Sequence, residues 1–394
     1  MRTGLAIVGV VVLLGLGGLA SQGKRPIAPE SLRAPAKTTA LRAQAGGIAT
    51  VGVTATMQHS VAEGHPVVLS YPGASYVKVH VKMLLLPGEY LTVTDRSGGQ
   101  SARYGAAVID RWLMSVDGDT AVLTVRGKLT HVVVDKIARG FTPAERAAQR
   151  KVEQSHRDAA VTAMHRGADG QARCATGPAA DAACFKGSHP VAYGNSRAVA
   201  LLLIDGMRLC TAWRVGPDNR MMTDNHCLST TASARDTEIW FNDECLICGG
   251  DTITKPVKVT GDEVLFTDAT LDFTLFSVQN FAAVRPFGYL SLDVRDPKPG
   301  EQLYVPQHAN GDPTVIATGS GPSGSGACEV VSPVANGYAK GTDVSYYCDT
   351  SGGSSGSPVI SWNSDKVVAL HHFGGCPDSG VRIDLIYPKI RSLI

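Results

Sequence analysis

The sequence predicts an all-β protein in which a small antiparallel β-sandwich precedes a larger unit of short strands. Apolar and polar residues alternate at 75–82, 91–94 and 121–126, the pattern of strands with one buried face. Glycine-containing turns separate these segments, as in a sandwich. From 199–204 onward the chain again consists of short apolar runs and turns, with few helical stretches before 387–394. With 394 residues and 44% apolar content, the chain is long enough for two cores.

The N-terminus has the pattern of a secretory signal peptide at residues 1–20. Arg2 precedes an apolar stretch at 5–19, and small residues follow at the predicted cleavage point. A retained membrane anchor is the weaker alternative, because the stretch is short for a span and rich in glycine. Residues 21–47 are rich in Ala, Pro, Lys and Arg without periodicity and indicate a flexible lead. We therefore expect a secreted, extracellular protein with no stable membrane anchor after signal removal.

The two β units are predicted to be joined by a helix. Residues 48–140 form the sandwich, which we interpret as an accessory or pro-domain, the alternative being a passive spacer. Thr142-Pro-Ala-Glu145 has the form of a capping box with proline at the first helical position, so we expect a connecting helix and linker at 141–170. Residues 171–394 form the second unit. The polar stretch 167–183 is the expected site of proteolytic separation.

Composition excludes several classes of partner. The net charge is only +2, without a basic run or an acidic block, so nothing indicates a nucleic-acid partner. All nine cysteines lie at or beyond residue 174, which in an exported protein favours disulfides. Cys245-Leu-Ile-Cys248 has the spacing of half a zinc site, but no second pair follows it. We expect neither a metal nor a cofactor, and no calcium loop is recognisable.

The segment 348–359 contains serine in a glycine-dense turn ahead of an apolar strand. A serine hydroxyl attacks a carbonyl only with a general base beside it and donors for the oxyanion. Glycine at 352, 353 and 356 permits positive φ, so the N–H groups of Gly353 and Ser355 can converge on one point. A flexible Gly/Ser loop is the alternative, because seven of the eight residues from Ser351 to Pro358 are Gly or Ser.

A base and an acid occur upstream of this serine. His226 precedes Cys227 at the end of a short strand-like run, and a bond between Cys210 and Cys227 would hold the turn that carries it, contributing roughly 3 kcal/mol. Asp272 stands at the head of an apolar strand. A carboxylate there can accept the imidazole N–H and stabilise the imidazolium. His226, Asp272 and Ser355 are therefore the candidate catalytic residues.

Thr-Asp-Asn-His-Cys, Leu-Asp-Phe-Thr-Leu and Gly-Ser-Ser-Gly-Ser-Pro resemble the three signature blocks of the chymotrypsin-like serine peptidases. The Gly-x-Ser-Gly-Ser-Pro form is similar to the secreted bacterial branch with lysyl and glutamyl endopeptidases. The resemblance covers 171–394 and implies a double β-barrel that hydrolyses peptide bonds through an acyl-enzyme. It implies that His226 is the base, Asp272 its orienting partner and Ser355 the nucleophile, with an oxyanion hole at Gly353 and Ser355. Ser354 replaces the aspartate that pairs with a new N-terminus in animal enzymes, so we expect the turn to form without that ion pair.

The cysteines are expected to form a disulfide framework. Besides Cys210 with Cys227, we expect Cys328 with Cys348, which tethers the strand before the serine turn. The resemblance to lysyl endopeptidases further implies Cys174 with Cys376, and Cys184 with either Cys245 or Cys248. One cysteine remains unassigned.

Specificity rests on a second group of residues. Asp349 stands where the trypsin pattern has the carboxylate of the first specificity pocket, and Asp378 lies near the lysine-binding carboxylate of lysyl endopeptidases. Both favour substrates with Lys or Arg. Gly374 is assigned to the same pocket. His372 resembles the histidine with which glutamyl endopeptidases receive an acidic side chain, so glutamyl specificity is the alternative. A purely structural alternative for Asp349 is that it braces the turn by accepting backbone N–H groups.

The resemblance predicts a monomeric serine endopeptidase, made as a zymogen, that acts on protein or peptide substrates. A catalytically inactive binding or adhesion protein of the same fold is the first alternative. A single-turnover self-cleaving protein is the second, disfavoured because little chain follows the predicted final helix.

Overall fold

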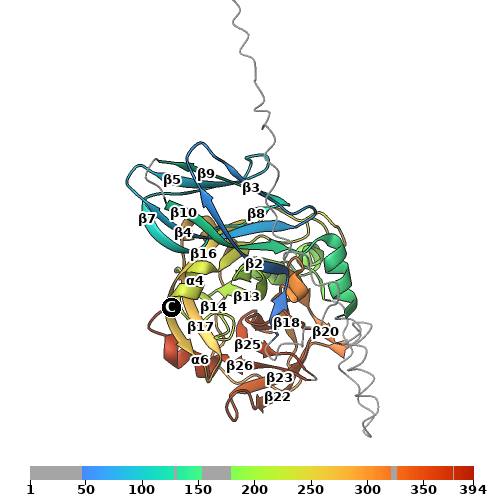
Figure 1. The fold of residues 1–394 in the computed structure, drawn as a ribbon. Coiled ribbons are helices and arrows are strands. Elements are labelled where there is room, and N and C mark those ends of the chain that lie inside the picture. Colours follow the sequence, from blue (N-terminus) through green and yellow to red (C-terminus); the bar gives the residue numbers. More distant parts are fainter. Residues whose placement is uncertain (1–46, 128–130, 153–178, 321–325, 376) are drawn as a thin grey trace, which may run out of the picture.

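The computed structural model describes residues 47–127, 131–152, 179–320, 326–375 and 377–394 (Figure 1). The predicted signal peptide, nearly all of the flexible lead, Cys174 and Cys376 lie outside these residues. Among the described residues, no helix is both long and apolar enough to cross a membrane.

The N-terminal β unit consists of two antiparallel sheets that enclose one core, shown in blue to green-blue at the top of Figure 1. One sheet has the order β2-β10-β4-β7, with β8 paired to β4, and the other has the order β3-β9-β5-β6. Leu69, Val81 and Leu123 are fully buried between them. The strands are β2 (Gly52–Val61), β3 (Val67–Ser70), β4 (Tyr76–Leu85), β5 (Tyr90–Asp95), β6 (Ser101–Tyr104), β7 (Ala107–Trp112), β8 (Val116–Asp117), β9 (Thr120–Arg126) and β10 (His131–Gly140).

A closed barrel of six strands follows. The strands pair in the order β13-β12-β15-β16-β17-β14, and β14 pairs back with β13 to close the ring. Its core contains Leu202, Phe241 and Phe276, all inaccessible to solvent. The strands are β12 (Val199–Ile204), β13 (Arg208–Arg214), β14 (Met221–Thr223), β15 (Glu238–Phe241), β16 (Val257–Asp268) and β17 (Phe273–Val278).

The C-terminal sheet curls into a barrel that is closed less completely. Its order is β11-β19-β18-β24-β25-β26-β23-β22, and a single bridge between Gln302 and Glu329 links the start of β18 to β22. Val305, Tyr346 and Val368 are buried in its core. The strands are β11 (Ala180–Asp181), β18 (Leu303–Gln307), β19 (Val315–Ala317), β22 (Glu329–Ala335), β23 (Asp343–Tyr347), β24 (Pro358–Ser361), β25 (Val367–Phe373) and β26 (Asp378–Arg382), with β20 (Gly319–Ser320) and β21 (Gly326–Ala327) forming a separate pair. The predicted all-β double barrel is confirmed.

Helices are short. Residues 143–152 are helical, and Thr142 and Glu145 form the predicted capping box, because each side chain accepts the other's backbone N–H. The final helix was placed at 387–394, but it spans 383–390; Asp384 in its first turn suits the helix N-terminus. The remaining elements are α2 (Phe185–Ser188), α3 (Pro190–Ser196), α4 (Thr231–Asp236), α5 (Phe281–Val284) and α6 (Ile383–Ile390), with the 3-10 turns η2 (Ala182–Cys184), η3 (Arg285–Phe287) and η4 (Ala309–Gly311).

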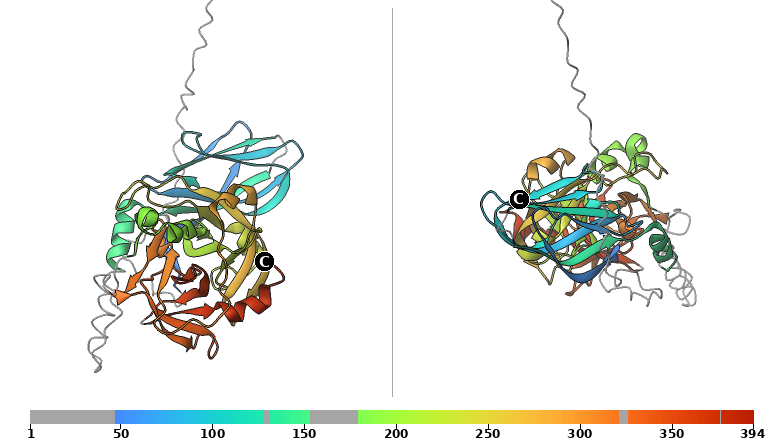
Figure 2. Two further views of the ribbon diagram at one scale, coloured as in Figure 1. Left: turned by 180° about the vertical axis from the view of Figure 1, so that it is seen from behind. Right: turned by 45° about the horizontal axis from the view of Figure 1, so that its top comes forward.

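The sandwich packs directly on the first barrel, as both views of Figure 2 show. Lys78 of β4 and Glu238 of β15 form an ion pair of 2.7 Å in which both side chains are buried. The Glu238 carboxylate also accepts hydrogen bonds from the backbone N–H and the hydroxyl of Ser115. The Tyr76 hydroxyl donates to the carbonyl of Gly206 at 2.8 Å. A buried and fully hydrogen-bonded contact of this kind fixes the orientation of the two units.

Three disulfides lie in the described part of the chain. Cys210–Cys227 and Cys328–Cys348 are present as predicted. Cys184 bonds to Cys248, so its assignment to Cys245 is wrong. Cys245 is a buried thiol instead. Spacing alone could not separate the two choices, since the cysteines lie only three residues apart on one loop.

Candidate active site

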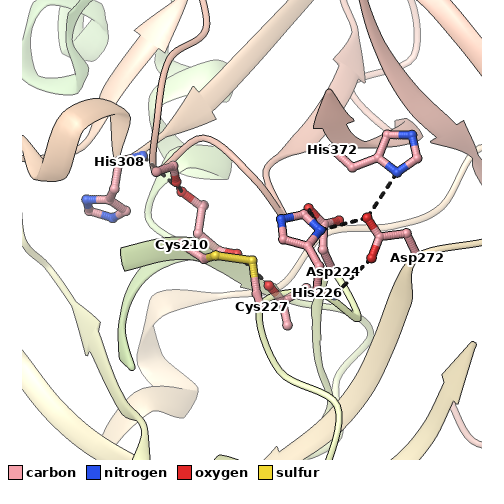
Figure 3. Close-up of a disulfide and its surroundings, with 10 residues drawn as sticks. Cys210, Asp224, His226, Cys227, Asp272, His308 and His372 are labelled. Atoms are coloured by element: carbon pink, nitrogen blue, oxygen red, sulfur yellow. Dashed lines mark hydrogen bonds and ion pairs between the residues drawn. A yellow bond between two sulfur atoms is a disulfide. The ribbon is translucent and has the colours of Figure 1, made fainter. Parts of the chain in front are cut away.

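His226 and Asp272 meet at one end of the first barrel (Figure 3). His226 follows β14 in a turn that the Cys210–Cys227 bond ties to β13. Asp272 precedes β17 with a φ of +47°, a conformation that aspartate tolerates better than most residues. Its Oδ2 lies 2.7 Å from Nδ1 of His226, and its Oδ1 accepts the backbone N–H of His226 at 2.9 Å. The carboxylate therefore fixes both the ring and the backbone of the histidine.

This geometry sets the ionisation of the aspartate. Burial alone would raise the pKa of Asp272, but hydrogen bonds from His226 and His372 outweigh it and lower the pKa below its usual value. Asp272 is therefore ionised at neutral pH and accepts the Nδ1 proton of His226. That tautomer leaves the lone pair of the neutral ring on Nε2. Among the described residues, the buried Nε2 has no hydrogen-bond partner.

His372 is held differently from the prediction. Its Nδ1 lies 3.2 Å from Oδ2 of Asp272, and its Nε2 lies 2.7 Å from Oδ2 of Asp343. Burial opposes its protonation, but the two carboxylates raise the pKa of His372. Because both ring nitrogens are bonded to carboxylates, His372 has no nitrogen left for an acidic substrate side chain. His372 thus contacts Asp272 on the side of the carboxylate that also accepts Nδ1 of His226, and its role in substrate binding stays a prediction. Asp343 was not identified from the sequence, because only the pairing of β23 with β26 brings it here.

Asp224 is a second carboxyl group that sequence reasoning did not single out. It is inaccessible to solvent, and its Oδ2 lies 3.8 Å from Nδ1 of His226. Burial, then the charge of Asp272, raises the pKa of Asp224 well above its usual value. Burial and the neighbouring charge of Asp272 thus both favour the protonated form of Asp224 beside His226. The position of Asp224, two residues before His226, is the feature of the sequence that could have identified it.

Ser355 lies in a buried turn ahead of β24. Gly353 and Gly356 have φ of +94° and +86°, so the turn requires glycine at both positions. A β-carbon at 356 would lie 2.1 Å from the carbonyl oxygen of Thr211. The N–H of Thr211 in β13 donates to the carbonyl of Ser355 at 2.8 Å. This bond joins the serine turn of the second barrel to the strand that carries Cys210.

The predicted oxyanion donor is engaged by the chain itself. The N–H of Gly353 donates to the carbonyl oxygen of Gly47 at 2.5 Å. Gly47 immediately precedes the part of the chain that enters β1 (Ala49–Thr50), which pairs with β13. The N-terminal segment thus lies against the serine turn.

The other predicted specificity residues, Asp349, Gly374 and Asp378, lie on either side of the serine turn in sequence. Oδ2 of Asp349 accepts the backbone N–H of Ala179, a residue 170 positions earlier in the chain, at 2.9 Å. Asp378 is buried and accepts the N–H of Gly375 at 2.7 Å. Burial is the main cause that raises the pKa of Asp378 to about 8, and the charge of Asp349 adds to it. A β-carbon at Gly374 would lie 3.8 Å from the hydroxyl of Thr350.

Three groups of side chains bring possible metal ligands within 4.8 Å of one another. Cys210 and Cys227, grouped with His226, are joined in a disulfide and offer no thiolate. In the group of Asp224, His226 and Asp272, the Asp272 oxygens and Nδ1 of His226 are engaged in hydrogen bonds, whereas the Asp224 oxygens have no hydrogen-bond partner among the described residues. The third comprises His80, Asp110 and Asp135 on the sandwich. In this third group, Nδ1 of His80 and Oδ1 of Asp135 are hydrogen-bonded to each other at 2.6 Å.

Residues 210–370 match the family model described as a trypsin-like peptidase domain. The curated protein "Secreted RxLR effector protein 73" of Plasmopara viticola is 36% identical over 217 residues, which is 53% of this chain and 52% of the relative. The chain thus spans about half the length of that relative.

Solved structures of low identity are also similar. The active form of the Rv3671c protease of M. tuberculosis is 15% identical, with a TM-score of 0.40 over 55% of this chain and 87% of that one. A serine endoprotease of Yersinia pestis is 10% identical, with a TM-score of 0.38 over 52% and 65%. The family model covers His226, Asp272 and Ser355 together, so the chain contains a trypsin-like serine peptidase domain.

Proposed function

We propose that this trypsin-like peptidase domain makes the protein a secreted serine endopeptidase, with His226, Asp272 and Ser355 as its catalytic residues. The observation that carries the proposal is that Asp272 accepts two hydrogen bonds from His226, one from Nδ1 at 2.7 Å and one from the backbone N–H at 2.9 Å. The hydrogen bond at Nδ1 leaves Nε2 as the basic nitrogen of His226. It is the arrangement that general-base activation of a serine requires.

The proposed reaction begins at Ser355. Nε2 of His226 takes the hydroxyl proton as Oγ attacks the substrate carbonyl carbon, and ionised Asp272 stabilises the imidazolium that forms. The oxyanion is stabilised by the N–H groups of Gly353 and Ser355. His226 then returns the proton to the leaving amine, and water hydrolyses the acyl-enzyme by the same sequence of steps.

We propose that the enzyme cleaves after Lys or Arg. Asp349 and Asp378 supply two acidic groups near the serine turn, coupled closely enough that the charge of Asp349 raises the pKa of Asp378. A cationic side chain between them would stabilise both ionised forms. Glutamate would be repelled by the carboxylate of Asp349, and both ring nitrogens of His372 already hydrogen-bond to carboxylates. Basic specificity is therefore favoured over the glutamyl alternative.

Secretion is supported by the three disulfides, which persist in oxidising compartments. The name of the Plasmopara viticola relative includes the word "secreted". We further propose that the sandwich at 48–140 acts as an accessory or pro-domain, because its buried ion pair with Glu238 fixes it on the peptidase.

The proposal is tested with a fluorophosphonate probe, which reacts with activated serines. After prolonged incubation of the full chain we expect one label on Ser355, identified by mass spectrometry of peptides. The Ser355→Ala and His226→Ala variants should carry none. Absence of label on Ser355 at any time would overturn the proposal and favour the inactive binding protein.

A further inference from the structure

Residues 47–51 lie along the candidate active site, with Ala49 and Thr50 forming the short strand β1. The carbonyl oxygen of Gly47 accepts the N–H of Gly353, and Ala49 pairs with Leu209 of β13, one residue before Cys210. The N–H of Val51 then donates to the carbonyl of Met207 at 2.8 Å. The segment is thus held by main-chain bonds at both of its ends, as an extended peptide is held on a strand edge.

Gly47 lies against the nucleophile. A β-carbon at this position would be 2.5 Å from Oγ of Ser355 and 3.8 Å from the carbonyl oxygen of His372. Its φ is +64°, a conformation that favours glycine. Position 47 therefore accepts only a residue without a side chain, both for space and for backbone conformation.

The sandwich holds this segment in place. Only Val51 separates β1 from β2, the first strand of the sandwich. Val51 packs with Leu209 and Tyr76 in a cluster of buried residues between the two units. The hydroxyl of Tyr76 and the buried Lys78–Glu238 pair fix the sandwich itself. The segment is therefore presented to the site by a rigid support, which reduces the entropy lost when it binds.

We propose that residues 47–51 are an intramolecular inhibitor of the peptidase, which stays latent until this segment leaves the cleft. The inference rests on the proposed function, since it assigns a role to the same serine. While the segment is seated, the Gly353 N–H is unavailable to the oxyanion of a substrate. A peptide substrate must displace the segment from the edge of β13. Gly47 offers no cationic side chain to Asp349 and Asp378, so the segment occupies the site without the feature proposed for a good substrate.

The test compares the rate of fluorophosphonate labelling of the full chain with that of the Gly47→Ala variant. The added methyl group collides with Oγ of Ser355, so it should displace the segment and raise the labelling rate by about tenfold or more. Gly64→Ala is the matched control. Gly64 also has positive φ, at +74°, but a β-carbon there has no atom within 4 Å. It should label at the wild-type rate.

Hydrogen exchange supplies a second measurement that does not depend on the variant. In wild-type protein the amides of 47–51 should be protected, and covalent labelling of Ser355 should remove that protection. Equal labelling rates for wild type and Gly47→Ala, with fast exchange of 47–51 in unlabelled protein, would overturn the inference while leaving the proposed function intact. No labelling of any variant would instead overturn the proposed function.

Self-cleavage is a distinct outcome. If mass spectrometry finds an N-terminus at Ile48 in wild-type protein and not in Ser355→Ala, the segment is a substrate, and its role as an inhibitor is overturned.

Discussion

Oδ2 of Asp272 lies within hydrogen-bonding distance of two histidines, 2.7 Å from Nδ1 of His226 and 3.2 Å from Nδ1 of His372. The second histidine continues to Asp343, so an alternating chain of two imidazoles and two carboxylates runs into the core. Hydrogen bonds from both histidines keep the pKa of Asp272 low although burial would raise it. If Asp272 orients the base as proposed, His372 is a positioning residue for Asp272 and does not itself contact the substrate.

His372→Ala should lower kcat with little change in KM. A hydrogen bond to a charged group contributes about 1.5–3 kcal/mol, so we expect kcat to fall about 10- to 100-fold. Steady-state kinetics on one peptide substrate measure the split between kcat and KM. His372→Gln, which keeps a donor for Asp272, should recover part of the loss. A fall in thermal stability with unchanged kcat would show that His372 serves the fold alone.

Asp378 predicts a dependence of stability on pH. Burial raises the folded-state pKa of Asp378 from 3.8 to about 8, so between these values the unfolded chain releases a proton that the folded protein keeps. The contribution of Asp378 to the free energy of unfolding is therefore most favourable below pH 4 and is lost as the pH rises toward 8. Asp378→Asn should be more stable than wild type at pH 7, by a few kcal/mol at most, and should approach wild type at pH 4. Urea unfolding at both pH values measures the difference. A gap that does not grow with pH would contradict the assignment.

The proposed specificity is tested with four synthetic substrates that differ only in ending with Lys, Arg, Glu or Phe. Wild type should prefer Lys and Arg, and Asp349→Asn should reduce kcat/KM for those two by about 10- to 100-fold while sparing Phe, because a buried charge pair is lost. Asp349 also braces Ala179, so the Phe substrate reports whether the turn itself is intact. Equal losses on all substrates would reduce Asp349 to that bracing role.

The candidate catalytic residues are the part of this molecule that the sequence marks most directly. His226, Asp272 and Ser355 each stand in a local pattern of strand, turn and cysteine that the sequence displays directly. The contact of His372 with Asp343 could not be read in this way, because it depends on the register of β23, β26 and β25. No periodicity marks residues 47–51 either. Ala49 pairs with Leu209 across the whole sandwich in sequence, and this pairing follows from how the two units pack.

The packing of the two units predicts the last outcome. Lys78→Met would leave Glu238 buried without its closest cation, and loss of one partner of a buried pair costs about 3–5 kcal/mol. The matched control is Lys82→Met on the same strand, since Lys82 is 58% exposed and lies 3.5 Å from Asp135. That exposed pair contributes about 0–1 kcal/mol. Urea unfolding should show a large loss of stability for Lys78→Met and not for Lys82→Met. If the sandwich holds residues 47–51 in the cleft, Ser355 of the Lys78→Met variant should also react faster with fluorophosphonate. A loss of stability in Lys78→Met without faster labelling would mean that residues 47–51 stay in the cleft independently of this contact.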